Sequence, residues 1–453
     1  MAALTPLAQA SVGGTLYVNA NTGMDSGTCR LAAHPCATIS YALTKSSTTA
    51  TSTIDVAAGN YPKALAITHS VSIVGAADSG ASATIIDPST LITDTDTDSS
   101  IPQDTVVDVT GTSGVTLKDL EVSGTNAESD FTGCGDDFVG VYYHDSSGTM
   151  NTVQVTGIEL TGDLFGCQDG QAVYVASDAG DTSSVTMTKL KINNFQKNGV
   201  TCDDAGTTCS LGGSAITGIG PNDQIAPNGF QGVDTASVTL NKNSIKDNSY
   251  TVGGPDSQAT GVLIFDVGAV TVTGNTLGAN DINAYFGSDG TGPGEQAWTI
   301  SGNTVSNAAD NVPGGSAGFG WGIQLDSTSN SVSISDNTVH GSKAYGIALT
   351  GANNATVNGN TVTGSGSDGI YVGGPGSVSG ATFSGGNFIE DNNSNANHGD
   401  GIHADTDSDE NTFSGNTTKT NLLYDLEDAG TGNSWTSDAC TPAHDSNPAG
   451  LCD

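Results

Sequence analysis

The sequence of 453 residues is poor in basic side chains. It has 11 lysine and arginine residues against 48 aspartate and glutamate residues, which gives a formal charge of −37, and Arg30 is its single arginine. A field of this sign repels polyanions such as nucleic acids and unmodified pectin or alginate. We therefore expect no nucleic-acid partner, and the charge favours neutral substrates or cations.

Long apolar runs are also missing. No segment has the roughly 20 consecutive apolar residues that a transmembrane helix needs, so we predict no membrane span. The first residues, Met1-Ala2-Ala3, lack the charged start and apolar stretch of a secretory leader. We therefore expect a mature chain.

Eight cysteines fall into four neighbouring pairs. An even number of cysteines with partners close in sequence is typical of disulfides formed in an oxidising compartment. We therefore predict four disulfides and a secreted, extracellular protein. Metal binding is the rival interpretation, but the spacings do not match the usual zinc patterns. The predicted pairs are Cys29 with Cys36, Cys134 with Cys167, Cys202 with Cys209, and Cys440 with Cys452.

The phrase Asn-Thr-Val recurs, with variants, through the second half of the chain. A period of some 20 to 50 residues predicts a repeat architecture. An Asn directly after a strand predicts a turn whose side chain bonds the backbone, repeated as a ladder in successive coils. The phrase begins at Asn243, Asn275, Asn303, Asn337 and Asn360, with degenerate copies at Asn387 and Asn416.

A second phrase, Gly followed by Val or Ile, alternates with the first. Around it Val, Thr and Ile alternate with a period of two, which indicates half-buried strands. Together the phrases predict a solenoid in which each strand pairs in parallel with its equivalent one coil along, about 4.8 Å away. The repeated glycines are Gly140, Gly199, Gly232, Gly261, Gly322, Gly346, Gly369 and Gly401.

The two alternating phrases resemble the right-handed parallel β-helix repeats of the pectate-lyase-like superfamily, over roughly residues 53–435. The resemblance implies an all-β fold, a right-handed parallel β-helix (β-solenoid) with an N-terminal cap helix and a disulfide-closed C-terminal end. We predict an initial strand and cap in residues 1–50, with a short helix near Thr38–Leu43. Coils with loop insertions occupy 51–435 and a C-terminal cap 436–453. The insertions are expected at 123–134, 205–228, 250–260, 287–295 and 306–318.

If the coils are in phase, side chains two and four positions after the repeated Gly form columns on the solvent side. Asp234 and Gln324, among others, lie two residues after the repeated Gly, and His144 and Asp326 lie four residues after it. Asp266 lies five after its Gly, so a bulge is needed to bring it into line.

Carboxylates on adjacent or alternate coils lie about 5 or 10 Å apart, near the separations that glycosidases use. We therefore predict Asp234, Asp266 and Asp326 as catalytic residues. Aromatic rings beside carboxylates suit sugar binding. The alternative is that these acids are ordinary solvated surface in an acidic protein. The predicted substrate-binding residues are Phe230, Tyr285, Trp321, Gln324, Tyr142 and His144.

Two further segments combine acids with histidine. Residues 134–145 contain Asp136, Asp137 and His144, and the Gly-Asp-Asp resembles that of polygalacturonase-type hydrolases, although no Gly-His-Gly or Arg-Ile-Lys accompanies it. In residues 397–405, His403 and Asp405 share one strand face. The second segment could bind a divalent cation or pair an acid with a base.

The resemblance and the acids favour a glycoside hydrolase that acts on a neutral polysaccharide or oligosaccharide through paired Asp residues. A non-catalytic surface or adhesion solenoid that binds glycans or partners is the main alternative. A calcium-assisted polysaccharide lyase or epimerase is the third, although pectate lyases commonly use an Arg base and Arg30 lies in the cap. No cofactor is predicted, and calcium and oligomer formation are left open.

Overall fold

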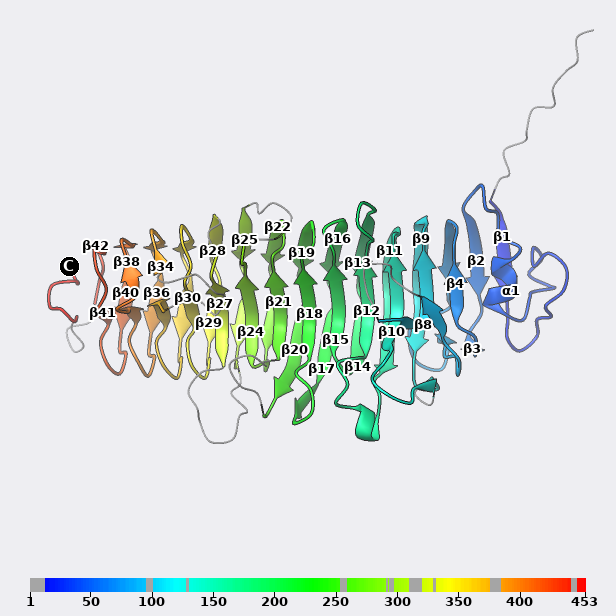
Figure 1. Cartoon of the computed structure of the whole chain (residues 1–453), viewed down its shortest axis with the longest axis horizontal. Coiled ribbons are helices and arrows are strands. Elements are labelled where there is room, and N and C mark those ends of the chain that lie inside the picture. Colours follow the sequence, from blue (N-terminus) through cyan, green and yellow to red (C-terminus); the bar gives the residue numbers. More distant parts are fainter. Residues whose placement is uncertain are drawn as a thin grey trace, which may run out of the picture.

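The structure of the chain is a computed structural model. The structure describes residues 13–94, 101–127, 130–252, 259–290, 292, 297–308, 320–328, 331–374, 384–440 and 446–453. Coils of parallel strands stack along one axis into a long rod (Figure 1). Strand β1 and helix α1 lie at one end of the rod, and strands β41 and β42 lie at the other (Figure 1). The predicted β-solenoid is confirmed.

Three faces run the length of the rod, and one strand of most coils belongs to each face. Face 1 is a separate 14-stranded sheet, whereas faces 2 and 3 belong to one 26-stranded sheet. Strands β9 (Ser113–Ser123) and β11 (Ser147–Ile158) join faces 2 and 3, because each of these strands runs across both. All described pairings between neighbouring strands are parallel, except that of β7 with β8.

Face 1 consists of β4 (Leu65–Ile67), β7 (Ile92–Asp94), β8 (Gln103–Thr110), β10 (Asp137–His144), β12 (Gln171–Ala176), β15 (Asn198–Asp203), β18 (Asn228–Val233), β21 (Thr260–Phe265), β24 (Ile282–Gly287), β27 (Trp321–Asp326), β30 (Ile347–Thr350), β33 (Ile370–Gly373), β37 (Ile402–Ala404) and β41 (Leu426–Asp428).

Face 2 contains, besides parts of β9 and β11, β1 (Thr15–Val18), β2 (Ser52–Val56), β5 (Val71–Val74), β13 (Ser183–Thr188), β16 (Thr207–Gly212), β19 (Ser237–Asn241), β22 (Ala269–Thr273), β25 (Trp298–Ser301), β28 (Val332–Ser335), β31 (Thr356–Asn358), β35 (Phe388–Glu390), β39 (Thr412–Ser414) and β42 (Ser434–Thr436).

Face 3 contains β3 (Gly59–Tyr61), β6 (Thr84–Ile86), β14 (Lys191–Phe195), β17 (Ala215–Asn222), β20 (Ser244–Tyr250), β23 (Thr276–Gly278), β26 (Thr304–Ser306), β29 (Thr338–His340), β32 (Thr361–Thr363), β36 (Asn393–Asn395) and β40 (Thr417–Lys419). Two short strands, β34 (Ser384–Gly385) and β38 (Ser408–Asp409), pair with each other.

The ends of the rod are covered as the sequence predicts. Helix α1 (Ile39–Leu43) begins after Thr38, whose hydroxyl accepts a hydrogen bond from the Tyr41 N–H. All four predicted disulfides are present. No helix in the described part of the chain is long and apolar enough to cross a membrane.

The inward side chains of equivalent positions stack in columns. On face 1, Ile323, Ile347, Ile370 and Ile402 pair in register, and none of the four is exposed. The Gly before each Ile is needed because a Cβ at Gly346, for example, would collide with the Val362 side chain and the Gly369 carbonyl. The Gly-Ile phrase is thus a packing requirement of the corner.

A ladder of buried Asn side chains connects the coils at the corner between faces 2 and 3. The Asn303 amide donates to the Val272 carbonyl and to Asn337 Oδ1, both at 2.9 Å. Its own Oδ1 accepts from the backbone N–H and the side chain of Asn275, at 2.9 and 3.0 Å. The same bonds repeat at the inner rungs, so the ladder fixes the register of one coil on the next; at its ends Asn243 accepts from the Ser214 N–H and Asn416 donates to Asp438. Its rungs are Asn243, Asn275, Asn303, Asn337, Asn360, Asn392 and Asn416.

One predicted copy of the Asn phrase, at Asn387, lies at a different corner from the other copies. The rung between Asn360 and Asn416 is Asn392, whereas Asn387 belongs to a second ladder with Asn411 and Asn433. Phe388 pairs with Thr356, which lies one corner before Asn360. Both ladders use Asn before a short strand, so the local sequence does not distinguish them.

The predicted insertion at 205–228 is wrong, because this segment holds β16 and β17. Its high Gly content hides an alternation in which Cys209 and Leu211 face the core. The segment 123–134 has no strand after Ser123 among its described residues. Much of the predicted insertions at 250–260, 287–295 and 306–318 lies outside the described residues.

The Asn ladder yields a stability prediction. We expect Asn303→Ala to lower the free energy of unfolding by about 3 kcal/mol, because it leaves several buried backbone and amide groups of the ladder without partners. Asn241→Ala serves as the control, because Asn241 is exposed and bonds Thr273 on the surface. It should cost no more than about 0.5 kcal/mol. Urea unfolding followed by circular dichroism measures both, and equal losses would contradict a structural role of the ladder.

Candidate functional site

The outward side chains of face 1 form three columns that run along the rod. The strand register places the repeated middle position in one line, and its members lie outside the main hydrophobic core. The column thus lies on the outer side of the sheet, but the solvent exposure expected for the position two after the Gly is not general, because Tyr142 and Ala348 are 0% exposed. The middle column is Tyr142, Tyr174, Thr201, Gln231, Leu263, Tyr285, Gln324, Ala348, Tyr371, His403 and Glu427.

The predicted alignment fails in one coil. Phe230 pairs with Val200 on one side and with Val262 on the other, so Gly229, and not Gly232, occupies the repeated Gly position. Gln231 therefore belongs to the middle column in place of Asp234. Asp234 moves to the position directly after the strand, where it is equivalent to Asp266.

Asp234 and Asp266 are corner residues with left-handed backbone conformations, with φ of 51° and 52°. The equivalent corners of other coils hold Asp, Ser or Gly, the residue types that accept a positive φ most readily. This position therefore has a structural reason to be Asp. Its equivalents with positive φ are Gly111, Asp145, Asp204, Ser327, Gly351 and Gly374.

Hydrogen bonds tie Asp266 to the next coil. Its Oδ1 accepts from the Ser288 hydroxyl at 2.8 Å and from the Asp289 N–H at 2.9 Å, and the residue is 1% exposed. Burial raises the pKa of Asp266, and contact with the Asp289 carboxyl adds to the effect. Burial also raises the pKa of Asp234, with contributions from the charges of Asp266 and Asp289.

Asp326 lies two coils beyond Asp266, about 10 Å along the rod by the spacing of strands. It is fully buried, and its carboxylate accepts hydrogen bonds from Tyr285 Oη at 2.9 Å and Thr350 Oγ1 at 3.2 Å. Asp234 and Asp266 are thus neighbours, whereas Asp326 belongs to a separate hydrogen-bonded group. A catalytic role of these three residues stays a prediction.

The predicted substrate-binding residues divide into three groups. Phe230 points into the core and is 0% exposed, so a surface ligand cannot reach it. Tyr142 and His144 stack on each other and are also buried. Tyr285 and Gln324 are neighbours in the middle column, and Trp321 lies at the edge of the same face.

A row of contacting rings crosses four successive coils of face 1; Trp321, Tyr345 and His403 are partly exposed, and Tyr371 is buried. Trp321 and Tyr345 meet edge to face at 5.6 Å, Tyr345 and Tyr371 stack at 4.6 Å, and Tyr371 meets His403 at 5.6 Å. We call these four residues the ring row. Tyr345 is not among the predicted binding residues, although Trp321 and Tyr345 both directly precede the Gly of the Gly-Ile phrase.

Carboxyl groups surround the last ring of the row. His403 Nδ1 lies 3.1 Å from Asp368 Oδ2 and 3.6 Å from Asp400 Oδ2, and its Nε2 lies 3.8 Å from Glu427 Oε2. Burial, a hydrogen bond with Glu427 and the charge of Asp368 raise the pKa of Asp400 to about 7. Burial opposes a charge on His403, but the three acids outweigh it and raise the pKa of the imidazole.

The pKa of Asp405 is shifted in the opposite direction. Burial alone would raise its pKa, but the Tyr371 hydroxyl at 2.6 Å and the Thr406 N–H donate hydrogen bonds to the carboxylate and lower it. The prediction that His403 and Asp405 form a pair is therefore replaced by two contacts, His403 with Asp368 and Tyr371 with Asp405. The pKa values of Asp400 and Asp405 are thus shifted in opposite directions in the surroundings of His403.

Three groups among the described residues have metal-ligand spacing. They are His144 with Asp145 and Asp178, Asp368 with Asp400 and His403, and Asp169 with Cys134 and Cys167. The third group cannot use its sulfur atoms, because both cysteines are in a disulfide.

The Gly-Asp-Asp segment forms a carboxyl pair with the next coil. Asp137 contacts Asp169, and burial followed by this contact raises the pKa of Asp169 to about 7. Asp136 is exposed, and its charge adds to the raised pKa values of Asp137 and Asp169.

Comparisons with known proteins agree with the β-helix fold. A family model described as "Right handed beta helix region" matches residues 294–387 and 321–438. No curated protein sequence matches the chain.

Solved structures with similar folds include polysaccharide-related proteins. The catalytic unit of the GH87 alpha-1,3-glucanase from Streptomyces thermodiastaticus is 16% identical, with 84% of this chain and 63% of the glucanase unit covered and a TM-score of 0.54. The periplasmic alginate epimerase AlgG is 9% identical over 82% of this chain and 77% of its own, with a TM-score of 0.42. The AlgE6 A-module of Azotobacter vinelandii, a mannuronan C-5 epimerase, is 13% identical over 86% and 91%, with a TM-score of 0.41.

At these identities the similarity concerns the fold alone. The matched repeats, the parallel sheets and the stacked coils lead to one conclusion: the chain has a right-handed parallel β-helix fold.

Proposed function

We propose that the protein is a glycoside hydrolase that binds a neutral polysaccharide along the ring row of face 1. The observation that carries the proposal is the ring row itself, a line of contacting rings that ends among acids whose pKa values are shifted in opposite directions. Its four disulfides suit secretion into an oxidising compartment, where polysaccharides are found.

The ring row supports binding of an extended glycan. Aromatic faces pack against the apolar faces of sugar rings, and the row continues over four coils, or about 14 Å at the spacing of neighbouring strands. That length suits an oligosaccharide stretch better than a single sugar. The formal charge of −37 disfavours polyuronates, so the glycan is neutral.

The acids beside His403 support general acid–base chemistry. Asp400 and Glu427 contact each other through their carboxyl groups, and this contact helps raise the pKa of Asp400 to about 7. Glu427 is the member that faces a substrate, because its side chain is 21% exposed and that of Asp400 is 1% exposed. Glu427 protonates the glycosidic oxygen, and the ionised Asp405 takes a proton from the attacking water.

The ring row is equally compatible with a non-catalytic glycan-binding solenoid. The two functions differ in one measurable respect, the release of reducing sugar. A calcium-assisted lyase would instead release products with an ultraviolet absorbance, and it would require a substrate that the acidic surface repels.

The binding prediction concerns the exposed rings. We expect Trp321→Ala and Tyr345→Ala each to weaken the binding of neutral oligosaccharides about tenfold, because each removes a stacking surface. Phe388→Ala is the control, since Phe388 is 45% exposed but lies on face 2. Isothermal titration calorimetry against a panel of neutral glycans measures the change. Equal effects of all three substitutions would argue against a ring-row site.

The catalytic prediction concerns the acids. We expect Glu427→Gln and Asp405→Asn each to lower reducing-sugar release about 100-fold or more, while glycan binding is retained. Asp234→Asn, Asp266→Asn and Asp326→Asn test the other predicted set in the same assay. Loss of turnover in those variants alone would move catalysis to the Asp234, Asp266 and Asp326 group, and binding without turnover in the wild type would establish the non-catalytic function.

The pH profile provides a further test. Because the pKa of Asp400 is raised to about 7, Asp400 loses its proton as pH rises through that value, and turnover should fall with it. On the acidic side, activity should persist to unusually low pH, because the pKa of the base Asp405 is lowered. In Glu427→Gln, the decline of residual turnover near pH 7 should disappear.

A further inference from the structure

A second histidine lies near the N-terminal end of face 1, apart from the ring row. His144 is the last residue of β10 and is 4% exposed. Its Nε2 lies 3.0 Å from Asp178 Oδ1 and 3.8 Å from Asp145 Oδ2. Its Nδ1 lies 3.1 Å from Asp94 Oδ2. Three carboxylates from three parts of the chain thus surround one buried imidazole.

The spacing of three of these atoms fits a metal ion. Zinc binds nitrogen and carboxylate oxygen at about 2.0–2.2 Å, so neighbouring ligand atoms lie about 3–3.6 Å apart. The distances of 3.0 and 3.8 Å from His144 Nε2 lie close to that range, and the three atoms are all within 4.8 Å of one another.

Other contacts hold these ligand atoms in place. Carboxylate oxygens face both ring nitrogens, Asp94 at Nδ1 and Asp178 at Nε2. In the tautomer that donates from Nδ1 to Asp94, the Nε2 lone pair faces Asp178 and Asp145 and can bind a metal. Asp145 Oδ1 accepts the Asp178 N–H at 2.8 Å, so Oδ2 is the oxygen that faces the histidine. Tyr142 stacks on the imidazole at 5.3 Å and 19°, and Tyr174 packs against Tyr142. The site is therefore organised by the fold before any ion arrives.

We propose that His144, Asp145 and Asp178 bind a Zn²⁺ ion, with Asp94 orienting the imidazole through its other ring nitrogen, Nδ1. Zinc is favoured over calcium, because calcium takes six to eight oxygen ligands and this group offers a nitrogen and two carboxylates. Three protein ligands leave the fourth tetrahedral position to water. The site is independent of the glycan function proposed above.

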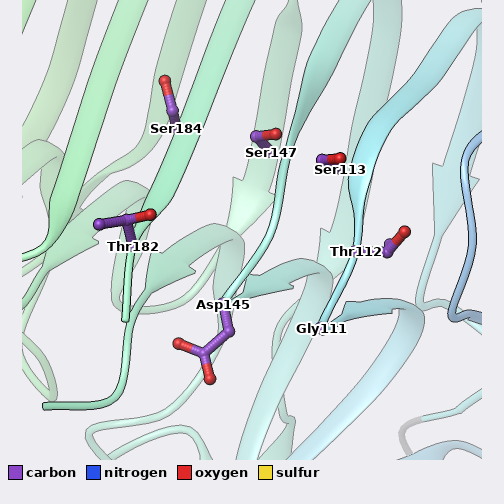
Figure 2. A pocket seen from close by; sticks show the side chains of 7 residues that line it. All are labelled: Gly111, Thr112, Ser113, Asp145, Ser147, Thr182 and Ser184. Atoms are coloured by element: carbon purple, nitrogen blue, oxygen red, sulfur yellow. The ribbon is translucent and has the colours of Figure 1, made fainter. Parts of the chain in front are cut away.

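The surroundings of Asp145 are open and polar. This residue also lines a hollow of about 440 Å³ with Gly111, Thr112, Ser113, Ser147, Thr182 and Ser184. Figure 2 shows Ser113, Ser147 and Ser184 in a row on neighbouring strands, with Asp145 beside them. The strand register places these serines at equivalent positions. The hollow brings solvent next to Asp145, and this gives an ion a route to the cluster.

The experiment measures zinc bound to the intact protein. After incubation with Zn²⁺ and dialysis, we expect one zinc per chain by elemental analysis, and we expect zinc to raise the midpoint of thermal unfolding. Asp145→Asn and Asp178→Asn should each weaken zinc binding at least about tenfold, because a neutral amide replaces a charged ligand. Asp94→Asn should weaken zinc binding by about 10–100-fold, because it removes the carboxylate that orients the imidazole at Nδ1.

Matched controls separate ligand loss from misfolding. Asp145 has φ of 48°, which Asn accepts, so Asp145→Asn keeps the corner intact. Asp204→Asn is the same substitution at an equivalent corner outside the cluster, with φ of 74°, and should leave zinc binding unchanged. All variants are compared by thermal unfolding in the presence of a chelator.

The histidine of the other acidic group is the decisive control. His403→Gln should leave zinc binding unchanged, whereas His144→Gln should abolish it. The proposal is overturned if the wild type retains no zinc, if His403→Gln removes the ion, or if Asp145→Asn and Asp178→Asn bind zinc as the wild type does.

Discussion

The register of one coil on the next is the constraint on which every feature of this protein depends. Buried amides set it: each Asn of the ladder bonds the backbone of one coil and the side chain of the next. The aliphatic columns of face 1 then fit because equivalent residues lie directly above one another. The same alignment assembles the ring row from residues more than twenty positions apart in sequence.

Parallel stacking also brings equivalent charges together, which is costly in a chain with a formal charge of −37. Asp137 meets Asp169, and Asp400 meets Glu427, in each case from adjacent coils. Like charges at this separation cannot both ionise easily, so a shared proton stabilises each pair. Repetition of the fold therefore creates carboxyl groups that titrate near neutral pH, which is the property that acid–base chemistry requires.

Much of the fold could be predicted from the sequence, because the fold repeats. The recurring Asn and Gly phrases, the cap helix after Thr38 and the four disulfides are each set by local sequence. The site could not be predicted in the same way, since a slip of three residues at Gly232 placed Asp234 in the wrong column. The Gly-Val pair there matches the phrase, but Phe230 fills the inward position. Tyr345 was missed because it precedes its strand, and only the packing of neighbouring coils brings its ring against Tyr371.

The last rung of the Asn ladder is an aspartate. Asn416 donates from its backbone N–H and its amide to Asp438 Oδ1, both at 2.8 Å, and Asp438 is fully buried beside the Cys440–Cys452 disulfide. A carboxylate accepts but has no N–H to pass on, so the relay of amide donors stops there. The exchange of one side-chain nitrogen for oxygen therefore ends the series of amide-to-amide hydrogen bonds beside this disulfide.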